Sequence, residues 1–379
     1  MQSEFAATGH KFKAFHILQP EGGGVPRVVA DLVREQLQAG MDAVVACHPG
    51  LSSAGDLRAA GAHVLPWRAT RSPGPRLASE VRAVARMVQT CRPDVVHAHS
   101  AKAGVAARLA LRGRVPTVFQ PHAWSFSAVE GTMAAATLRW ERFAARWCDR
   151  IVCVSAAERN EGQAAGIAAR WDVIPNGVDL SRFGPAPGSG ERRRPPLVVC
   201  VGRLCRQKGQ DVLLRAWPEV LGAVPDARLA LVGDGPLRSR WEATAPARVE
   251  FVGGVADVLP WLHRADLLVL PSRWEGMALA PLEAMATALP VVVTDVNGAR
   301  ESLPTGHRDV ALVPPEDPRA LARSVATLLA DAPLRVAMGR QVFSHAQESF
   351  DVRRAAQAVM DVYRRVTPPA PAARERQPV

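Results

Sequence analysis

Short apolar runs alternate with amphipathic stretches along this chain, and the alternation occurs twice within its 379 residues. The runs 13–20 and 42–48 have the length and the apolar character of buried strands. The stretch 26–40 between them carries apolar residues at helical spacing and ends at a glycine. Strands that alternate with helices predict a parallel sheet with crossover helices, so the expected fold class is α/β.

The pattern predicts further elements in both halves. In the first half it predicts strands at 94–100, 116–122, 150–155 and 171–177, and helices at 79–91 and 104–112. In the second half it predicts strands at 197–202, 227–233, 249–254, 265–272 and 290–295, and a helix at 210–224. Two doubly wound units facing each other would leave a cleft, and ligands of such sheets bind beyond the carboxyl ends of the strands.

A segment rich in Pro, Gly and Arg at 181–196 separates the two patterns and is typical of an exposed linker. We therefore expect one domain over residues 1–185 and a second over 186–350. A last amphipathic helix is predicted at 351–366, and the tail at 367–379 has the composition of a disordered segment.

The bulk composition limits the classes of partner and compartment. A net charge of +11 and a pI of about 10.3 favour an anionic partner, whereas 5% aromatic residues with a single Tyr give no platform for stacking bases. The six cysteines form no C-x-x-C pair, which favours reduced thiols in the cytoplasm. The first residues lack the apolar core of a signal peptide, and no apolar run is long enough to span a membrane.

Two cations follow the strand predicted at 197–202. Arg203 and Lys208 lie in a turn that starts after Gly202, and such a turn suits a diphosphate. A solvated basic loop is the alternative for this stretch taken alone. Gly233 and Gly235 follow the next strand, where a tight turn would admit a flat group such as a nucleobase, or would be an ordinary turn.

Two glutamates lie near the strand end at 265–272. Glu275 falls in the loop and can reach sugar hydroxyls, while Glu283 lies early on the following helix and can accept from the paired hydroxyls of a ribose. Backbone N–H groups around Gly276, Met277 and Ala278 would point at an anion. The alternative is that both acids merely favour a helix N-terminus, which accounts better for Glu283 than for Glu275.

These stretches resemble the donor-binding domain of retaining glycosyltransferases of family four, which have the two-domain GT-B fold. The matching segments occur in the family's order and are "VGRLCRQKG", "LVGDGPL", "VEFVGG", "ADLLVLPSRWEGMALAPLEAMATALPVVVTD" and "NGARE". Glu275 and Glu283 correspond to the family's E-x7-E element. The family usually has a bulkier, glycine-containing version of "GMALAP", so this chain departs from it beside the sugar pocket.

The resemblance extends over 13–350. It implies that Gly23 and Gly24 of "EGGGVPRVV" lie in a loop against the donor phosphates or the acceptor. It also places His122 of "FQPHAWSF" as the active-site histidine that contacts the donor sugar. His97 and His99 form an H-x-H pair, but no third ligand has suitable spacing, so a metal site is not expected.

The resemblance implies a hexosyltransferase that moves a sugar from a nucleotide-diphosphate donor, usually UDP-linked, to an acceptor hydroxyl with retention of configuration. His122, Arg203, Lys208 and Glu275 would be catalytic, with the cations stabilising the departing diphosphate. No D-x-D occurs, so metal independence is expected and no cofactor beyond the nucleotide-sugar co-substrate. Expected acceptors are saccharides, lipid-linked saccharides or small molecules, in envelope polysaccharide, glycolipid or natural-product assembly.

Several alternatives stay open at this point. The stretch 138–150 is rich in Trp and Arg and predicts either a basic helix on the inner face of the cell membrane or a packed helix. A GT-B nucleotide-sugar epimerase would share the cleft but not E-x7-E. A non-catalytic glycosyltransferase-like partner would be expected to lack one of the cations or glutamates, and all are present. Nucleic acid is not an expected partner.

Overall fold

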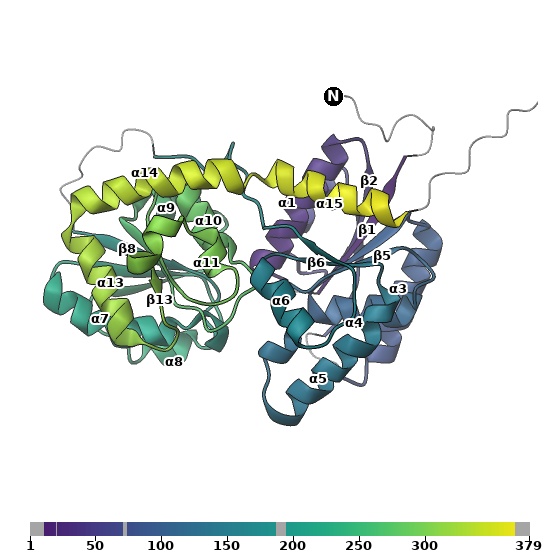
Figure 1. The fold of residues 1–379 in the computed structure, drawn as a ribbon, viewed down its shortest axis with the longest axis horizontal. Helices are drawn as coiled ribbons and strands as arrows, with labels where there is room; N and C mark the ends of the chain where they lie inside the picture. Colours follow the sequence, from purple (N-terminus) through teal and green to yellow (C-terminus); the bar gives the residue numbers. More distant parts are fainter. Residues whose placement is uncertain (1–10, 20, 71–73, 187–194, 368–379) are drawn as a thin grey trace, which may run out of the picture.

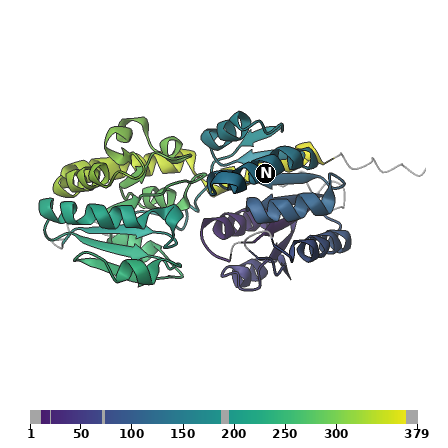
Figure 2. The same cartoon turned by 90° about the horizontal axis from the view of Figure 1, so that it is seen from below.

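The computed structural model describes residues 11–19, 21–70, 74–186 and 195–367. Over these residues the chain forms two α/β units, each with a parallel sheet between helices (Figures 1 and 2). The predicted α/β fold class with two parallel sheets is confirmed. Residues 187–194 of the predicted linker at 181–196, and all but Thr367 of the predicted tail at 367–379, fall outside the described residues.

The first unit contains a seven-stranded parallel sheet in the order β3-β2-β1-β4-β5-β6-β7. Its strands are β1 (Lys13–Leu18), β2 (Asp42–Cys47), β3 (His63–Pro66), β4 (Val95–His99), β5 (Thr117–Gln120), β6 (Arg150–Cys153) and β7 (Trp171–Val173). Its helices are α1 (Gly24–Gln38), α2 (Ala54–Ala59), α3 (Leu77–Cys91), α4 (Ser100–Leu111), α5 (Gly131–Ala144) and α6 (Ala156–Ala164), with 3₁₀ turns η2 (Ser125–Ser127) and η3 (Ala145–Trp147).

The second unit contains a six-stranded parallel sheet in the order β10-β9-β8-β11-β12-β13. Its strands are β8 (Leu197–Val201), β9 (Arg228–Val232), β10 (Val249–Gly253), β11 (Leu267–Leu270), β12 (Val291–Thr294) and β13 (Leu312–Val313). Its helices are α7 (Gln210–Ala223), α8 (Arg238–Glu242), α9 (Leu259–Arg264), α10 (Leu279–Ala286), α11 (Ala299–Ser302), α12 (Arg308–Ala311), α13 (Pro318–Ala330) and α14 (Ala332–Ser349), with 3₁₀ turns η4 (Arg206–Lys208) and η5 (Thr305–His307).

The central strands of both sheets are almost wholly apolar because helices cover both faces. Every residue of β11 and β12 is buried, and so is every residue of β4, including two histidines. Buried parallel strands read as continuous apolar runs rather than as an alternation, which is why their positions follow from the sequence. β3 and β13 were not predicted, because each is a short edge strand that lacks such a run.

The chain passes between the two units twice, and the two passages run side by side. The backbone N–H of Val178 donates to Phe350 O at 2.7 Å, and that of Val352 donates to Val178 O at 3.1 Å. A Cβ on Gly177 would stand 2.4 Å from the Cα of Val352, so only glycine fits there. The predicted strand 171–177 therefore ends at Val173, and the following residues form the crossing.

The last helix, α15 (Val352–Val366), packs on the first unit, whereas α14 packs on the second. In Figure 1 the two helices, drawn at the yellow end of the colour scale, lie end to end and extend across both units. Asp351 accepts a hydrogen bond from Arg353 N at 2.8 Å and so caps α15. The buried face of α15 joins a cluster with Val95, Val118 and Val152 of the first sheet, and it brings Tyr363 into that core.

Helix α5 has one packed face and one exposed face. Arg108 of α4 is fully buried and donates to Glu141 of α5 at 2.8 Å, while its guanidinium stacks over Phe119. Met133 and Phe143 on the other face are 59% and 44% exposed. In the described part of the chain, no helix is both long and apolar enough to cross a membrane.

Candidate active site

The loop after β11 meets the loop after β5, and this contact joins the two units at the carboxyl ends of their strands. Gly276 lies against the first unit: a Cβ there would be 2.8 Å from Val154 Cγ2, 3.0 Å from Ala123 N and 3.1 Å from Glu158 Oε1. Any side chain at position 276 would push the two loops apart. Gly276 therefore sets how closely the acidic loop of the second unit approaches His122, the neighbour of Ala123.

Lys208 and Glu275 form an ion pair in this loop region. Lys208 Nζ lies 2.6 Å from Glu275 Oε1, and the hydroxyl of Ser272 donates to the same oxygen at 2.7 Å. Lys208 ends the turn η4, and Gly209 follows it at φ +66°. A Cβ on Gly209 would stand 2.0 Å from Pro271 O, so this close approach holds the basic turn against the end of β11.

Arg203 lies in the same basic loop and is partly exposed. Its backbone carbonyl accepts a hydrogen bond from Gln210 Nε2 at 3.1 Å, and its guanidinium makes no hydrogen bond or ion pair with any residue that the structure describes. The guanidinium is therefore available for a ligand, in contrast to the paired ammonium of Lys208.

The three glycines at the ends of β8 and β9 allow two loops to stack backbone on backbone. A Cβ on Gly233 would stand 2.2 Å from Gly202 O, and a Cβ on Gly235 would stand 2.3 Å from Leu204 O. The backbone of Leu204 also donates to Asp234 O at 3.0 Å. These glycines therefore allow the two loops beside Arg203 to pack closely, and this role does not depend on any contact with a ligand.

Glu283 lies on α10 and forms an ion pair with Arg27 of α1, in the other unit. Its side chain is 4% exposed and that of Arg27 is 31% exposed. Burial raises the pKa of Glu283, and the charge of Arg27 opposes this effect. The carboxylate that the sequence assigned to a ribose is thus paired with Arg27, for which the sequence predicted no role.

The N-terminal turn of α10 faces the glycine loop of the first unit. Gly23 precedes α1 with φ +95° and has open space around it, and Gly24 faces Leu279 Cδ1 at 3.9 Å from its would-be Cβ. Ala278 occupies the N-cap position of α10 without a side-chain cap, and the carbonyl of Met277 accepts a hydrogen bond from Asn176 Nδ2 at 2.7 Å. The glycine loop and the start of α10 are therefore neighbours across the two units.

His122 and Ala123 both adopt left-handed backbone conformations, with φ of +56° and +101°. Non-glycine residues with positive φ are strained and persist only where the surroundings hold them. Glu158 holds this turn: its Oε1 accepts from Ala123 N at 2.6 Å and its Oε2 accepts from Val154 N at 2.8 Å. The carboxyl is fully buried, and this burial raises the pKa of Glu158 to about 7.

His16, His97 and His99 form a buried cluster directly behind His122, with ligand atoms that all lie within 4.8 Å of one another. Sequence spacing offered no third ligand for His97 and His99, but the fold places His16 beside them, so that expectation was wrong for the arrangement in space. The parallel pairing of β1 with β4 sets His16 opposite His97, although the two are far apart in sequence. Imidazole nitrogens are a donor type that zinc prefers, but both ring nitrogens of His16 and of His99 are engaged in hydrogen bonds in this arrangement.

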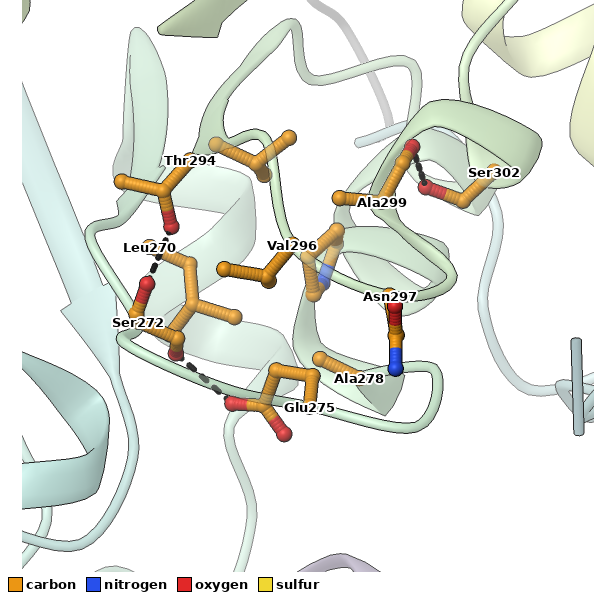
Figure 3. A pocket seen from close by; sticks show the side chains of 11 residues that line it. Leu270, Ser272, Glu275, Ala278, Thr294, Val296, Asn297, Ala299 and Ser302 are labelled. Carbon is orange, nitrogen blue, oxygen red and sulfur yellow. Dashed lines mark hydrogen bonds between the residues drawn. The ribbon is translucent and has the colours of Figure 1, made fainter. Parts of the chain in front are cut away.

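A pocket opens behind the loop that carries Glu275, between the ends of β11 and β12 and the starts of α10 and α11 (Figure 3). Its lining residues are Leu270, Ser272, Glu275, Ala278, Pro281, Val293, Thr294, Val296, Asn297, Ala299 and Ser302. Among the predicted site residues, Glu275 and Ala278 line it. It thus lies at the strand-end position where open α/β sheets bind ligands.

Residues of the "NGARE" stretch tie this pocket to the first unit. The carboxylate of Glu301 accepts from the backbone N–H groups of Ala156 and Ala157, at 2.7 and 2.8 Å, at the start of α6. Asn297 donates through Nδ2 to Glu161 of the same helix. From the sequence, this stretch was recognisable only as a family motif. Its contacts show that it connects the two units.

Profiles of two protein families match the chain. The description Glycosyltransferase Family 4 matches residues 22–182, and the description Glycosyl transferases group 1 matches residues 195–331. The two matches coincide with the two α/β units described above.

Curated relatives align over parts of the chain. It is 33% identical over 230 residues to the UDP-Gal:alpha-D-GlcNAc-diphosphoundecaprenol alpha-1,3-galactosyltransferase of Escherichia coli, a match that covers 54% of this chain but only 58% of that protein. It is 30% identical to the lipopolysaccharide core biosynthesis mannosyltransferase LpsB of Rhizobium meliloti, covering 59% of this chain and 68% of that protein. It is 32% identical to glycogen synthase of Mycobacterium tuberculosis, covering 72% and 69%.

Solved structures share the whole arrangement of two units. HepE of Anabaena in complex with UDP-glucose superposes with a TM-score of 0.80 at 23% identity, covering 93% of this chain and 99% of that chain. Sucrose-phosphate synthase of Thermosynechococcus elongatus superposes with a TM-score of 0.78 at 21% identity, covering 94% and 99%. The expected GT-B fold is confirmed, and the chain belongs to the group 1 glycosyl transferases of glycosyltransferase family 4.

Proposed function

We propose that this protein transfers a sugar from a nucleotide-diphosphate donor, UDP-linked, to an acceptor hydroxyl in glycolipid or polysaccharide assembly. The observation that carries the proposal is the meeting of the acidic loop with the His122 loop. Gly276 lies so close to the first unit that a Cβ on it would stand 3.0 Å from Ala123 N, and Lys208, paired with Glu275, lies at the same strand ends. Related proteins support the substrate class, because one is named for UDP-galactose and HepE was solved with UDP-glucose.

In the proposed reaction the acceptor hydroxyl attacks the anomeric carbon from the face that the diphosphate leaves, so configuration is retained. The bond between that carbon and the phosphate oxygen breaks, and the departing diphosphate takes the hydroxyl proton. Charge builds on the diphosphate, and Arg203 and Lys208 would stabilise it. Removing one such group is expected to cost about 10²–10³ in rate, by analogy with oxyanion-hole donors.

A bound donor must break or weaken two ion pairs that are present in this structure. Lys208 is bound to Glu275 and Glu283 to Arg27, so a bound diphosphate would draw Lys208 toward it and ribose hydroxyls would share the carboxylate of Glu283. Glu275 would then be free to accept from a hydroxyl of the sugar. Cationic side chains take the place of the metal that D-x-D enzymes use, so we propose that turnover needs no divalent ion.

The test is a thermal-shift screen with UDP, GDP and their sugar conjugates, each with and without EDTA. Ligand that binds the folded state raises the midpoint by mass action, and a tenfold excess over Kd adds about 1.4 kcal/mol of stability. We expect a selective shift with uridine nucleotides that EDTA does not change. A shift with guanosine nucleotides alone would reject uridine, and a shift that EDTA removes would reject metal independence.

A second measurement addresses chemistry rather than binding. The nucleotide sugar that gives the largest shift is incubated with the protein and a lipid-linked saccharide, and the product linkage is read by NMR. Retention predicts the same anomer in product and donor, whereas the opposite anomer would reject the proposed mechanism. A reaction of the donor without acceptor that changes only its sugar would indicate epimerisation instead.

A further inference from the structure

A row of hydrogen bonds runs from the interior of the first unit to His122. Gln36 Oε1 on α1 lies 2.8 Å from His16 Nε2 on β1. His16 Nδ1 lies 3.1 Å from His99 Nε2 at the end of β4, and His99 Nδ1 lies 3.2 Å from His122 Nε2. We call His16, His99 and His122 the histidine row. Each of its inner members is bonded through both ring nitrogens.

The members of the histidine row are neutral at physiological pH. Burial lowers the pKa of His16 to about 4 and that of His122 to about 3, and it lowers the pKa of His99 well below the usual value. A neutral imidazole has one N–H donor and one acceptor nitrogen. A row of such rings can therefore be bonded in only one of two directions, and all of its members share one tautomer.

The amide of Gln36 decides the direction. Its oxygen faces His16 and can only accept, so His16 must carry its proton on Nε2. His16 Nδ1 then accepts from His99 Nε2–H, and His99 Nδ1 accepts from His122 Nε2–H. We propose that Gln36, through this row, holds His122 as the Nε2–H tautomer and leaves its Nδ1 as an acceptor for a substrate hydroxyl.

The geometry of His122 fits this role. Its Nε2 is taken by His99, its Nδ1 has no hydrogen-bond partner among the described residues, and the residue keeps partial exposure. With the opposite tautomer, Nδ1 would donate and would serve a different ligand atom. The direction of the hydrogen bond between Gln36 of α1 and His16 thus determines whether Nδ1 of His122 donates or accepts.

The orientation of Gln36 depends in turn on the last helix. Gln36 Nε2 donates to Tyr363 Oη of α15 at 3.4 Å, and in this arrangement the amide oxygen faces His16. Tyr363 is fully buried, and its hydroxyl lies 2.7 Å from His97 Nδ1. The hydroxyl that accepts from Gln36 still has its own proton and a second lone pair for His97 Nδ1. Four residues therefore act as positioning residues: Gln36, His16, His99 and Tyr363. Only their expected effect on kcat rests on the proposed function.

The first test reads the tautomers directly and needs no activity. Long-range ¹H–¹⁵N spectra of the ¹⁵N-histidine-labelled protein distinguish the protonated nitrogen of each ring, and single His→Gln variants assign the signals. After EDTA treatment we expect Nε2–H at His16, His99 and His122. Nδ1–H at His122 would overturn the proposal, and so would signals typical of metal-bound nitrogen in the cluster.

The second test removes the residue that sets the direction. Gln36→Met keeps the size of the side chain but has no acceptor, so we expect His122 to show a mixture of tautomers. Val359→Ala is the matched control, because Val359 lies in the same buried cluster of α15 and touches no member of the row through a hydrogen bond. It should leave all three tautomers unchanged at a similar loss of thermal stability.

Turnover separates positioning from a general loss of structure. Gln36→Met should lower kcat about tenfold, the factor for one hydrogen bond, without changing the thermal shift that the nucleotide produces. An unchanged tautomer at His122 in Gln36→Met would overturn the proposal. Where that variant does not fold, Tyr363→Phe takes its place, with the same expected mixture, and the wild-type spectrum alone still decides the direction. The tautomer at His122 could change in Gln36→Met as expected, with nucleotide binding unchanged, while the wild type shows no transferase activity. That combination would count against the proposed function only.

Discussion

At the scale of single residues, the pairing of Glu283 with Arg27 bears most directly on donor binding. The two side chains come from different units, and Arg27 neutralises a carboxylate that would otherwise be buried without a partner. Because only the carboxylate can accept from ribose hydroxyls, the two partners have opposite effects on a nucleotide. One neutralising substitution on each side therefore separates ligand binding from stabilisation of the interface.

Glu283→Ala is expected to abolish the thermal shift produced by UDP, since the acceptor for the ribose is lost. Arg27→Met is expected to lower the free energy of unfolding by roughly 1–3 kcal/mol, because it leaves a buried carboxylate unpaired beside a partly exposed position. In Arg27→Met the shift with UDP should persist or grow, as the hydroxyls satisfy the freed carboxylate. Parallel melting curves with and without UDP check both variants. Equal loss of the shift in the two would reject the ribose assignment.

At the scale of elements, α11 and the start of α6 form a junction between the two units. Helix α6 presents backbone N–H groups at its start, and Glu301 of α11 accepts two of them from the other unit. Ser155 accepts from Glu158 N at 3.0 Å and caps the same helix from within its own unit. A carboxylate at a helix N-terminus also interacts favourably with the helix dipole.

Glu301→Ala is expected to lower the free energy of unfolding by about 1 kcal/mol, the usual effect of a lost N-terminal cap. Glu242→Ala serves as the control, because it removes the same charge from an exposed position whose partner, Arg238, lies on the same helix. That variant should change stability by less than about 0.5 kcal/mol. Chemical denaturation of the two variants and the parent provides the comparison. Indistinguishable losses would show that the cap across the units contributes nothing.

At the scale of the whole molecule, the buried histidines should make the fold sensitive to acid. Their folded pKa values lie below the ordinary value of 6.5, about 4 for His16 and about 3 for His122. A depressed folded pKa means that the stability contribution is complete above pH 6.5 and is lost as the pH falls toward the folded value.

Near pH 5.5 each of these histidines should therefore lower the free energy of unfolding by about 1.2 kcal/mol relative to pH 7. Thermal midpoints between about pH 8 and pH 5 measure the effect. Glu158 has the opposite sign, because its pKa is raised to about 7 and its contribution is lost as the pH rises through that value. His16→Gln should flatten the acid limb of the profile. An equally steep fall in that variant would exclude His16 as a source.

The sequence alone was sufficient for the repeating local pattern and for the family motifs. Buried parallel strands such as β8 and β12 are continuous apolar runs, and their predicted positions match within about a residue at each end. The meeting of Lys208 with Glu275 could also be expected, because both follow neighbouring strands whose carboxyl ends share one edge. Both inferences use information that lies within one element or at its end.

The contacts that give the candidate site its electrostatics came only from the tertiary structure. His16 joins His99 because β1 pairs with β4 in a particular register, and Arg27 reaches Glu283 because two separate units close on each other. Tyr363 acts on Gln36 although they are 327 residues apart. Apolar periodicity reports which face of an element is buried. It carries no information about which distant polar group faces it there, since that depends on strand register and on how the two units pack.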